Sequence, residues 1–425
     1  MTPSIATVSS ASADYDIIIV GAGAAGIAAG RRLATSGLKF RILEARARIG
    51  GRAWTVKREY PLDLGCGWLH SADVNPLTPL IKDIGFTIDR TLPTWGRHSL
   101  DLGFSKKEQA QFRKAMERFD ERIDAEALKG PDKPAAAFLE PGNRFNPLIA
   151  AVTTYISGVE PDRVSSHDTA RYADTEVDWR VVEGYGAGIA ALAKELPITL
   201  SCRVRRLDHS GSILRFETDE GVITARKAII TLPTNLLASE MLTFTPSLPE
   251  KTEAAAVLPL GLADKAVLGL DRPLNLPKDG HLFGRTDRTD TASYNLRPFG
   301  RNLIEAYFGG QLAADLENEG PNAFFAFAED ELTDLLGSSF RARLHRISET
   351  SWGKDPFACG SYSCALPGHA EARRVLAEPV DNRLFFAGEA CSIDSFSTAH
   401  GAYMTGLATA DAALGPFAAR AKSPT

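Results

Sequence analysis

The chain has 425 residues and a formal net charge of −5, from 48 Lys and Arg against 53 Asp and Glu. This balance offers no basic surface for a nucleic acid or an acidic membrane, so we expect neither partner. Hydrophobic residues make up 44% and charged residues 24% of the chain, as in ordinary globular proteins, and the length predicts two or three domains.

The N-terminus and the cysteines predict a cytoplasmic protein. Residues 1–13 are rich in Ser, Thr and Ala and lack the basic start and apolar run of a secretory signal, so we expect a disordered leader. No apolar run reaches the roughly 18 residues that cross a bilayer. The five cysteines form no C-x-x-C pair and the histidines have no metal-ligand spacing, so we expect neither a disulfide framework nor a metal site.

Residues 16–44 predict a strand–turn–helix–strand unit. The apolar, β-branched run 16–20 is typical of a strand that is buried on both faces. A glycine-rich turn follows it, then a helix at 27–36 that ends at Gly37. A second strand at 39–43 completes a βαβ unit within about 30 residues.

The glycine-rich turn predicts a dinucleotide site. Gly21 allows the tight turn out of the strand, Gly23 lets the backbone approach a pyrophosphate, and Gly26 lets the helix pack closely on the sheet. Ala25 precedes Gly26, where free N–H groups at the start of the helix attract phosphate. Glu44, at the end of the second strand, is placed to accept hydrogen bonds from ribose hydroxyls.

The residues after the second strand favour FAD over NAD. The segment 44–52, EARARIGGR, resembles the extended flavoprotein signature E-A-x-x-x-x-G-G-R. Gly51 allows a close approach of the backbone, and Arg52 is a fixed cation that can face a phosphate. We therefore add Ala45, Arg46, Gly51 and Arg52 to the cofactor site, with a solvated basic turn as the alternative for Arg46.

The rest of the chain alternates between helical and strand-like patterns. A charged, Ala-rich stretch at 105–129 predicts a solvated helix, and a proline-rich stretch at 130–147 predicts an extended connection. An antiparallel meander, two buried strands and a small-residue helix are predicted after it. The meander strands are 200–207, 213–218 and 222–225, the buried strands are 228–232 and 384–389, and the helix is 399–414.

Further segments, in a shared order along the chain, resemble the flavin-containing amine oxidase family, which includes monoamine oxidases, polyamine oxidases and bacterial nicotine-degrading oxidases. These segments are 63–70 (DLGCGWLH), Val204, 259–265 (PLGLADK), Trp352 with 360–362 (GSY), and 387–389 (AGE) with 400–406 (HGAYMTG). The resemblance implies an α/β fold, in which a Rossmann-like FAD-binding domain is interleaved with an α+β substrate-binding domain. We expect the FAD-binding domain at 14–75, 183–265 and 352–425, and the substrate-binding domain at 76–182 and 266–351.

The same resemblance implies roles for individual residues. Lys265 looks like the family's flavin-site lysine, which is held near the ring through a water, and Trp352 and Tyr362 look like its aromatic block. These three residues are assigned to catalysis. The residues that the resemblance assigns to the cofactor are Gly65, Cys66, Gly67, Trp68, Val204, Gly388, Glu389 and Ala402.

Two positions depart from the family pattern. Ser361 stands where mitochondrial monoamine oxidases have the cysteine that is bonded to the flavin, so we expect FAD without a covalent link. Thr398 stands where the family often has the second tyrosine of an aromatic cage, and Phe396 is a substitute from nearby. Thr398, His70 and His400 are assigned to the substrate pocket, with a structural histidine as the alternative for each of the last two.

The resemblance implies that a neutral amine gives up a hydride to the flavin, that the imine product hydrolyses to a carbonyl compound, and that O₂ reoxidises the flavin to give H₂O₂. An L-amino-acid oxidase is one alternative, which would need Arg90 or Arg97 to bind a carboxylate. A flavin dehydrogenase or desaturase with another electron acceptor is a second, and a non-catalytic flavin-binding protein a third. The helix at 105–129 is expected either to cover the pocket or to carry a homodimer contact.

Overall fold

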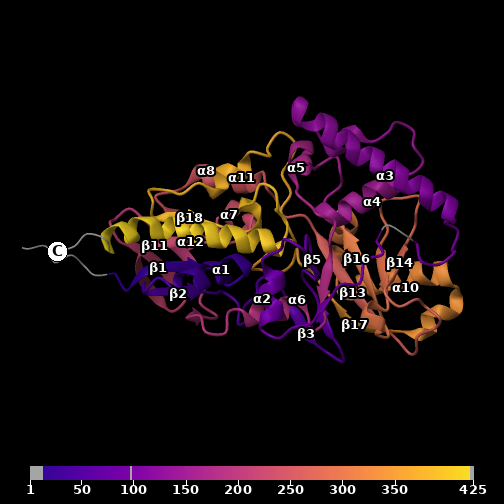
Figure 1. The fold of residues 1–425 in the computed structure, drawn as a ribbon, viewed down its shortest axis with the longest axis horizontal. Coiled ribbons are helices and arrows are strands. Elements are labelled where there is room, and N and C mark those ends of the chain that lie inside the picture. The colour runs from indigo at the N-terminus through magenta and orange to yellow at the C-terminus, as the bar shows by residue number, and fades with distance from the viewer. Residues whose placement is uncertain (1–12, 96–97, 422–425) are drawn as a thin grey trace, which may run out of the picture.

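The computed structural model describes residues 13–95 and 98–421, so the predicted leader at 1–13 lies, except for its last residue, outside the described residues. The architecture is mixed α/β. Two large sheets lie at opposite ends of the long axis, and short strands and helices fill the space between them (Figure 1).

The first sheet has eight strands and grows from the predicted βαβ unit. β1 (Tyr15–Val20) is parallel to β2 (Phe40–Leu43) and to β11 (Gly221–Ile230), and α1 (Ala24–Leu33) connects β1 to β2. The side chains of β1 from Ile17 to Ile19 have no exposed surface, because both faces of the strand are covered. The other strands are β8 (Ile198–Thr199), β9 (Val204–Asp208), β10 (Leu214–Thr218), β12 (Thr243–Thr245) and β18 (Leu384–Phe386), in the order β12-β9-β10-β11-β1-β2-β8 with β18 beside β11.

The predicted meander is present as β9, β10 and β11, but its last strand is longer than predicted. β11 unites the strands predicted at 222–225 and 228–232: its first half pairs with β10 and its second half with β1 and β18. The prediction divided it because Arg226 and Lys227 interrupt the apolar pattern. Lys227 is nevertheless buried, and its ammonium donates to the carbonyl of Ala413 at 2.5 Å.

Other predicted boundaries were also wrong. The first helix begins at Ala24 rather than residue 27, since the glycine turn leads directly into it. The stretch 130–147 is not extended throughout, because it forms a short helical turn at η2 (Ala135–Phe138) and then begins α4 (Asn146–Ser157). The strand predicted at 384–389 ends at Phe386 in β18.

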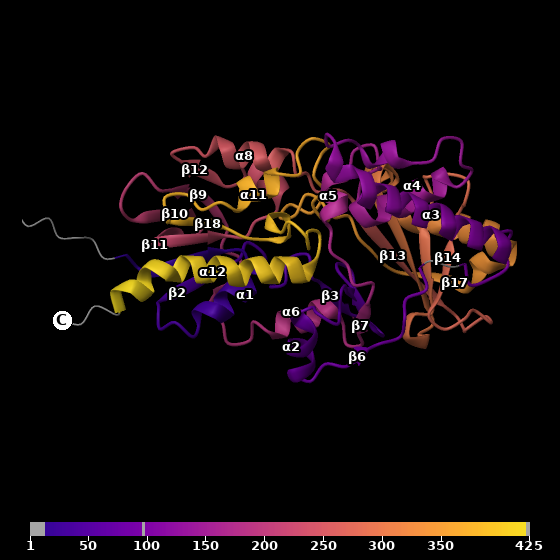
Figure 2. The same cartoon turned by 45° about the horizontal axis from the view of Figure 1, so that its top comes forward.

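The second sheet has five antiparallel strands. Its order is β14-β15-β16-β13-β17, with β13 (Ala263–Leu270), β14 (Gly280–Phe283), β15 (Ser293–Leu296), β16 (Leu303–Gly309) and β17 (Leu344–Glu349). Leu282 joins the core under α9 (Gly310–Glu319) and α10 (Ala323–Leu336), whereas its neighbour Phe283 joins the core under α3 (Lys106–Glu126) and α4. Since successive side chains of a strand point to opposite faces, helices cover both faces of this sheet (Figure 2).

Short elements join the two sheets. The strands are β3 (Thr55–Lys57), β4 (Pro61–Asp63), β5 (Trp68–Leu69), β6 (Ile88–Asp89) and β7 (Trp179–Val181). The helices in this region are α2 (Leu77–Asp83), α5 (Ser166–Arg171) and α6 (Tyr185–Ala191). Three further helices, α7 (Thr234–Ala238), α8 (Pro249–Ala256) and α11 (Ala372–Ala377), pack on the first sheet. Among the described residues, no helix has the length and apolar character needed to span a membrane.

The last helix, α12 (Ala399–Ala421), runs beside α1 (Figures 1 and 2). The contact is closest at Gly406, where an added Cβ would lie 2.2 Å from the carbonyl oxygen of Ala25. The backbones of the two helices can therefore approach only because residue 406 has no side chain. This contact fixes α12 at the N-terminus of α1, where the predicted dinucleotide site lies.

We expect Gly406→Ala to lower the free energy of unfolding by about 1–3 kcal/mol, the usual penalty for overfilling a packed contact. The measurement is urea denaturation. Gly415→Ala, in the same helix, is the matched control, because its Cβ would meet no atom within 4 Å. That variant should be as stable as the wild type or gain up to about 1 kcal/mol. Equal stability of both variants would contradict the tight contact.

Candidate active site

The N-terminus of α1 is open toward a ligand. Gly23 is the N-cap residue, and no side chain caps the helix. Gly21 has φ +106°, and a Cβ on Gly26 would lie 1.9 Å from the carbonyl oxygen of Gly21, so this turn requires glycine at both positions. A Cβ on Gly23 would meet only the carbonyl oxygen of Gly50, at 4.0 Å. The free N–H groups and partial positive charge of the helix end therefore fit the diphosphate of FAD.

Glu44 lies beside this turn, at the end of β2. Its carboxylate is buried and accepts hydrogen bonds from the backbone N–H groups of Ala22 and Arg46, both at 2.8 Å. These two bonds hold the carboxylate between the glycine turn and the next loop. The remaining lone pairs of the two oxygens fit a ribose diol, which donates two hydrogen bonds.

The arginines of the flavoprotein signature are bound to protein groups. Arg46 forms a bidentate ion pair with Asp355, with both N–O distances at 2.7 Å. Arg52 donates to the carbonyl of Ser361 at 2.6 Å and to Glu389 at 2.9 Å. Arg52 also lines a hollow that includes Gly388 and the end of β11. It therefore binds the segment 361–389 and borders the hollow beside Gly388.

Glu389 is the buried anion that receives Arg52. Its carboxylate also accepts from the hydroxyl of Ser363 at 2.6 Å and from the N–H of Ser397 at 3.0 Å. Burial opposes ionisation, but the charges of Arg52 and Arg373 outweigh it and lower the pKa of Glu389. The predicted cofactor residue Glu389 is thus an ionised link between three segments.

Ser361, the residue in place of the flavin-bonded cysteine, ties two segments together. Its hydroxyl donates to the carbonyl of Ala263 at 2.9 Å and accepts from the N–H of the same residue at 2.8 Å. This reciprocal pair fixes the segment 360–362 at the beginning of β13. Tyr362 and Lys265 are thereby brought to the same region.

A chain of close backbone contacts leads from α1 to Lys265. A Cβ on Gly51 would lie 3.3 Å from the Cα of Gly23, and one on Gly65 would lie 1.8 Å from the carbonyl oxygen of Arg52. A Cβ on Gly67 would lie 3.6 Å from the Nζ of Lys265. Close packing contacts therefore link the residues predicted to hold the diphosphate to the residues predicted to face the flavin.

Lys265 and Trp352 hold three successive carbonyls. The ammonium of Lys265 donates to the carbonyl oxygens of Asp63 at 2.8 Å and Gly65 at 2.7 Å. The indole N–H of Trp352 donates to the carbonyl between them, that of Leu64, at 3.1 Å. The segment 63–65 is therefore fixed from the second sheet, and Trp352 itself is buried.

Tyr307 is a site residue that the sequence analysis missed. Its hydroxyl lies 3.0 Å from the hydroxyl of Tyr362, and the centre of the Tyr307 ring lies 6.0 Å from the Nζ of Lys265. The hydroxyl of Tyr362 donates to the carbonyl of Tyr155. Burial raises the pKa of Tyr307 to about 12 and that of Tyr362 well above its usual value, so both phenols stay neutral. No sequence motif marks Tyr307. Its place in the site follows from the pairing of β13 with β16, which sets Tyr307 opposite Lys265.

The predicted pocket residues Thr398 and His400 lie in or next to the first turn of α12. The hydroxyl of Thr398 donates to the carbonyl of Ser395 at 2.7 Å and accepts from the N–H of Gly401 at 2.9 Å, so it starts the helix. His400 is buried, and burial together with the charge of His70 lowers its pKa to about 4. The ring of Phe396 packs on Tyr172 at 5.2 Å and under Arg373 at 4.0 Å.

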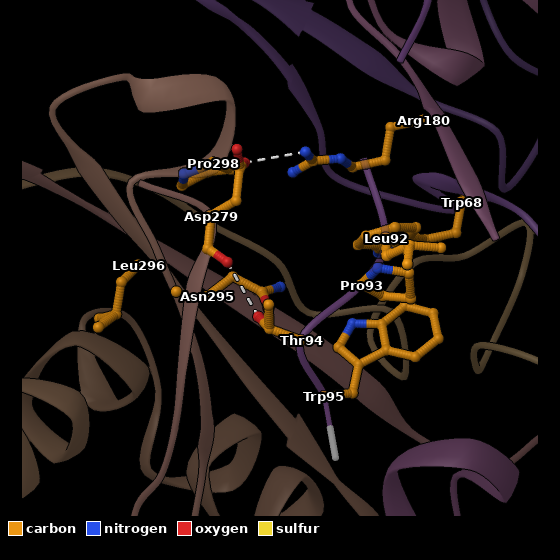
Figure 3. A pocket seen from close by; sticks show the side chains of 11 residues that line it. Trp68, Leu92, Pro93, Thr94, Trp95, Arg180, Asp279, Asn295, Leu296 and Pro298 are labelled. Atoms are coloured by element: carbon orange, nitrogen blue, oxygen red, sulfur yellow. Dashed lines mark hydrogen bonds and ion pairs between the residues drawn. The ribbon is translucent and has the colours of Figure 1, made fainter. Parts of the chain in front are cut away.

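His70 lies on the other side of this region. Its Nδ1 is 2.7 Å from the carboxylate of Asp178, and its ring centre is 6.0 Å from that of Trp95. Trp95 in turn meets Trp68 edge-on at 4.5 Å, and the two indoles line a hollow with Arg180 and other residues (Figure 3).

Three predicted cofactor residues lie within the scaffold. Burial and the charge of Asp63 raise the pKa of Cys66 to about 12, so its thiol stays neutral. Val204 is buried in β9, and Ala402 is half-buried in the first turn of α12. Residues 13–95 and 98–421 contain no cluster of His, Cys, Asp and Glu suited to a metal ion.

Comparisons with known proteins agree on the family. The family model described as flavin-containing amine oxidoreductase matches residues 24–146 and 96–414. Polyamine oxidase 4 of Oryza sativa subsp. japonica is 30% identical over 93% of this chain and 88% of its own length, and polyamine oxidase 2 of Arabidopsis thaliana is 30% identical over 93% and 87%. Human lysine-specific histone demethylase 2 is 26% identical over 92% of this chain but 52% of its own length.

Solved structures show the same fold. A putrescine oxidase structure superposes with a TM-score of 0.72, covering 93% of this chain and 98% of that chain at 19% identity. The expected α/β fold of the amine oxidase type is thus confirmed. This protein belongs to the flavin-containing amine oxidoreductase family and is an FAD-dependent enzyme that oxidises amines.

Proposed function

We propose that the enzyme oxidises a small-molecule amine to an imine, which hydrolyses to a carbonyl compound, and passes the electrons to O₂ to give H₂O₂. The observation that carries the proposal is that Lys265, Tyr307 and Tyr362 lie together next to the carbonyls of 63–65. Close packing contacts link this region to the N-terminus of α1. Bound FAD supplies the hydride acceptor of this reaction.

We propose the following division of the cofactor site. The N–H groups around Gly23 and Ala25 hold the diphosphate, Glu44 holds a ribose, and Val204 lies against the adenine. The flavin end is held by the segment 63–68 and by Gly388 and Ala402. The first sheet then belongs to an FAD-binding domain at 14–75, 183–265 and 352–425, and the second sheet to a substrate-binding domain at 76–182 and 266–351.

The two tyrosines at the flavin end orient the substrate and do not ionise. Tyr307 and Tyr362 are neutral phenols in mutual contact, so they form a wall beside the reacting carbon without adding a negative charge. Lys265 is a fixed ammonium that can assist the reduction of O₂ through a water. Hydride transfer needs this geometry more than it needs a base.

The charges around the site favour an amine over an amino acid. Arg180, which lines the hollow beside Trp68 (Figure 3), already pairs with Asp89 at 2.7 Å and with Asp279 at 2.9 Å. Arg90 lies over the ring of Trp179 at 4.3 Å, and Arg97 is outside the described residues. The acidic Asp178 beside His70 attracts a cation, not a carboxylate.

Since two plant relatives are named polyamine oxidases, we infer that polyamines are the first substrates to test. We also propose that the enzyme is cytoplasmic and forms a homodimer. In this proposal α3 either covers the pocket or carries the dimer contact.

Anaerobic mixing with a panel of primary, secondary and polyamines should bleach the oxidised flavin band at about 450 nm, because the flavin accepts the electrons of the amine. Admission of air should restore the band and produce H₂O₂ in proportion to the amine consumed. Amino acids serve as the control panel. Bleaching by amino acids alone would contradict the proposal, and so would reoxidation too slow to support turnover.

Lys265→Met should slow reoxidation of the reduced flavin by O₂ by ~100-fold, the scale on which a positioned proton donor acts. Flavin reduction by the amine should change much less, because the tyrosine wall remains. Stopped-flow absorbance separates the two half-reactions. Lys278→Met, which removes an exposed lysine beside Asp279, is the control and should leave both rates unchanged.

Acid precipitation should release the flavin into the supernatant and leave a colourless pellet, because Ser361 offers no thiol for a covalent bond. The absorbance of the two fractions is the measurement. A yellow pellet that survives washing would contradict non-covalent binding.

A further inference from the structure

Beneath Lys265 and Trp352 lie two buried carboxyl groups that the proposed chemistry does not use. Asp264 precedes Lys265 in β13 and has no exposed surface, and Glu317, in α9, is 5% exposed. Because successive side chains of a strand alternate, Asp264 points away from the Lys265 face, toward the helix that carries Glu317.

These carboxyls hold the segment that carries Trp352. One oxygen of Asp264 accepts from the hydroxyl of Thr350 at 2.6 Å and from the N–H of Trp352 at 3.0 Å. Glu317 accepts from the N–H of Gly353 at 2.8 Å. The hydroxyl of Thr350 also accepts from the N–H of Lys265 at 2.9 Å, so the same network reaches the backbone of the flavin-site lysine.

The second oxygen of Asp264 would be costly to bury as part of a charged carboxylate. This atom is buried and has no hydrogen-bond donor among the described residues. Burial raises the pKa of Asp264 to about 7, and the negative charge of Glu317 adds to the increase. A proton on one of the two carboxyls turns a repulsive contact into a hydrogen bond and satisfies the unpaired oxygen.

The ammonium groups near the two carboxyls bind backbone carbonyls. Lys265, on the same strand, directs its ammonium to the carbonyls of Asp63 and Gly65. Lys354 donates to the backbone carbonyl of Glu317. The phenols of Tyr307 and Tyr362 are neutral, and their pKa values are raised further by the charge of Asp264.

We propose that Asp264 and Glu317 share one proton and act as a positioning pair, which holds the segment 350–353 so that Trp352 and Lys265 keep the carbonyls of 63–65 in place. The inference rests on the proposed function, because it assumes that these carbonyls border the flavin. Neither carboxyl touches a reacting atom. Loss of the shared proton places two negative charges under Trp352, and this loosens its contact with Leu64.

Asp264→Asn and Asp264→Leu separate the charge from the hydrogen bonds. The asparagine amide still accepts from Thr350 and Trp352 and donates to Glu317, so it reproduces the protonated carboxyl without titrating. Leucine has a similar volume but removes the acceptor. We expect Asp264→Leu to lower kcat at least tenfold and Asp264→Asn to restore it to within about threefold of the wild type, a loss and a rescue on the scale of one buried hydrogen bond.

The pH dependence of the resting protein is the second readout. The wild type should show a step centred near pH 7 in its flavin absorbance and tryptophan fluorescence, and Asp264→Asn should lack it. Glu329→Gln is the matched control, because this carboxylate lies in α10 of the same body and a hydrogen bond from Arg346 lowers its pKa. That control should keep the step.

Thermal unfolding gives a third readout with a definite sign. The raised pKa of Asp264 means that the folded protein binds a proton which the unfolded chain has lost, so this contribution to stability disappears as pH rises through about 7. The melting temperature of Asp264→Asn minus that of the wild type should therefore increase between pH 5 and pH 8. The expected increase is about 3 °C or more.

A pH step that survives in Asp264→Asn would overturn the pair, and so would an Asp264→Leu enzyme with wild-type kcat. If Asp264→Leu does not fold, the spectrum and melting of Asp264→Asn and of the double variant Asp264→Asn, Glu317→Gln still decide. Spectra and melting need no amine. Loss of the step in a protein that oxidises no amine would therefore reject the proposed function and keep the pair.

Discussion

The fixation of three successive carbonyls by Lys265 and Trp352 is the constraint on which the candidate site depends. Lys265 belongs to the second sheet. The segment 63–65 packs against the carbonyl of Arg52, and the residue before Arg52 packs against Gly23 in the glycine-rich turn of the first sheet. These three hydrogen bonds therefore connect the region predicted to bind the diphosphate with the sheet that carries Tyr307. Buried donors and acceptors that lose a partner are costly, so the two sheets cannot drift apart at this point without a large penalty.

The molecule treats its buried carboxylates in two different ways. Asp168 is paired with Arg373 through two hydrogen bonds of 2.7 Å, and Glu389 is paired with Arg52, so these acids join distant segments through ion pairs. Asp264 and Glu317 have no such arginine among their described contacts and instead accept from the successive N–H groups of Trp352 and Gly353. Ion pairs thus fasten the scaffold around α11 and β18, while hydrogen bonds to two carboxyls without an arginine hold the segment that carries Trp352. The proposed proton sharing gives the second arrangement a charge that changes near pH 7.

The local parts of this fold could be predicted from the sequence because each depends on neighbours in the chain. The βαβ unit, the glycine roles at Gly21 and Gly26 and the meander follow from periodicity and from the absence of a Cβ. Tyr307 could not be found this way, because its place beside Tyr362 depends on the register between β13 and β16. The pairing of Asp264 with Glu317 joins a strand to a helix 53 positions later, and no local pattern marks it. The interruption of β11 by Lys227 misled the prediction because a lysine normally ends a buried run.

The hydroxyl of Ser361 also limits how this protein could change over evolutionary time. The hydroxyl both donates to and accepts from the backbone of Ala263, a role that oxygen fills in both directions and sulfur fills weakly. A single codon change to cysteine would supply a nucleophile for tethering the prosthetic group but would weaken the entry into β13. A cysteine at this position would therefore require a compensating change at the entry into β13.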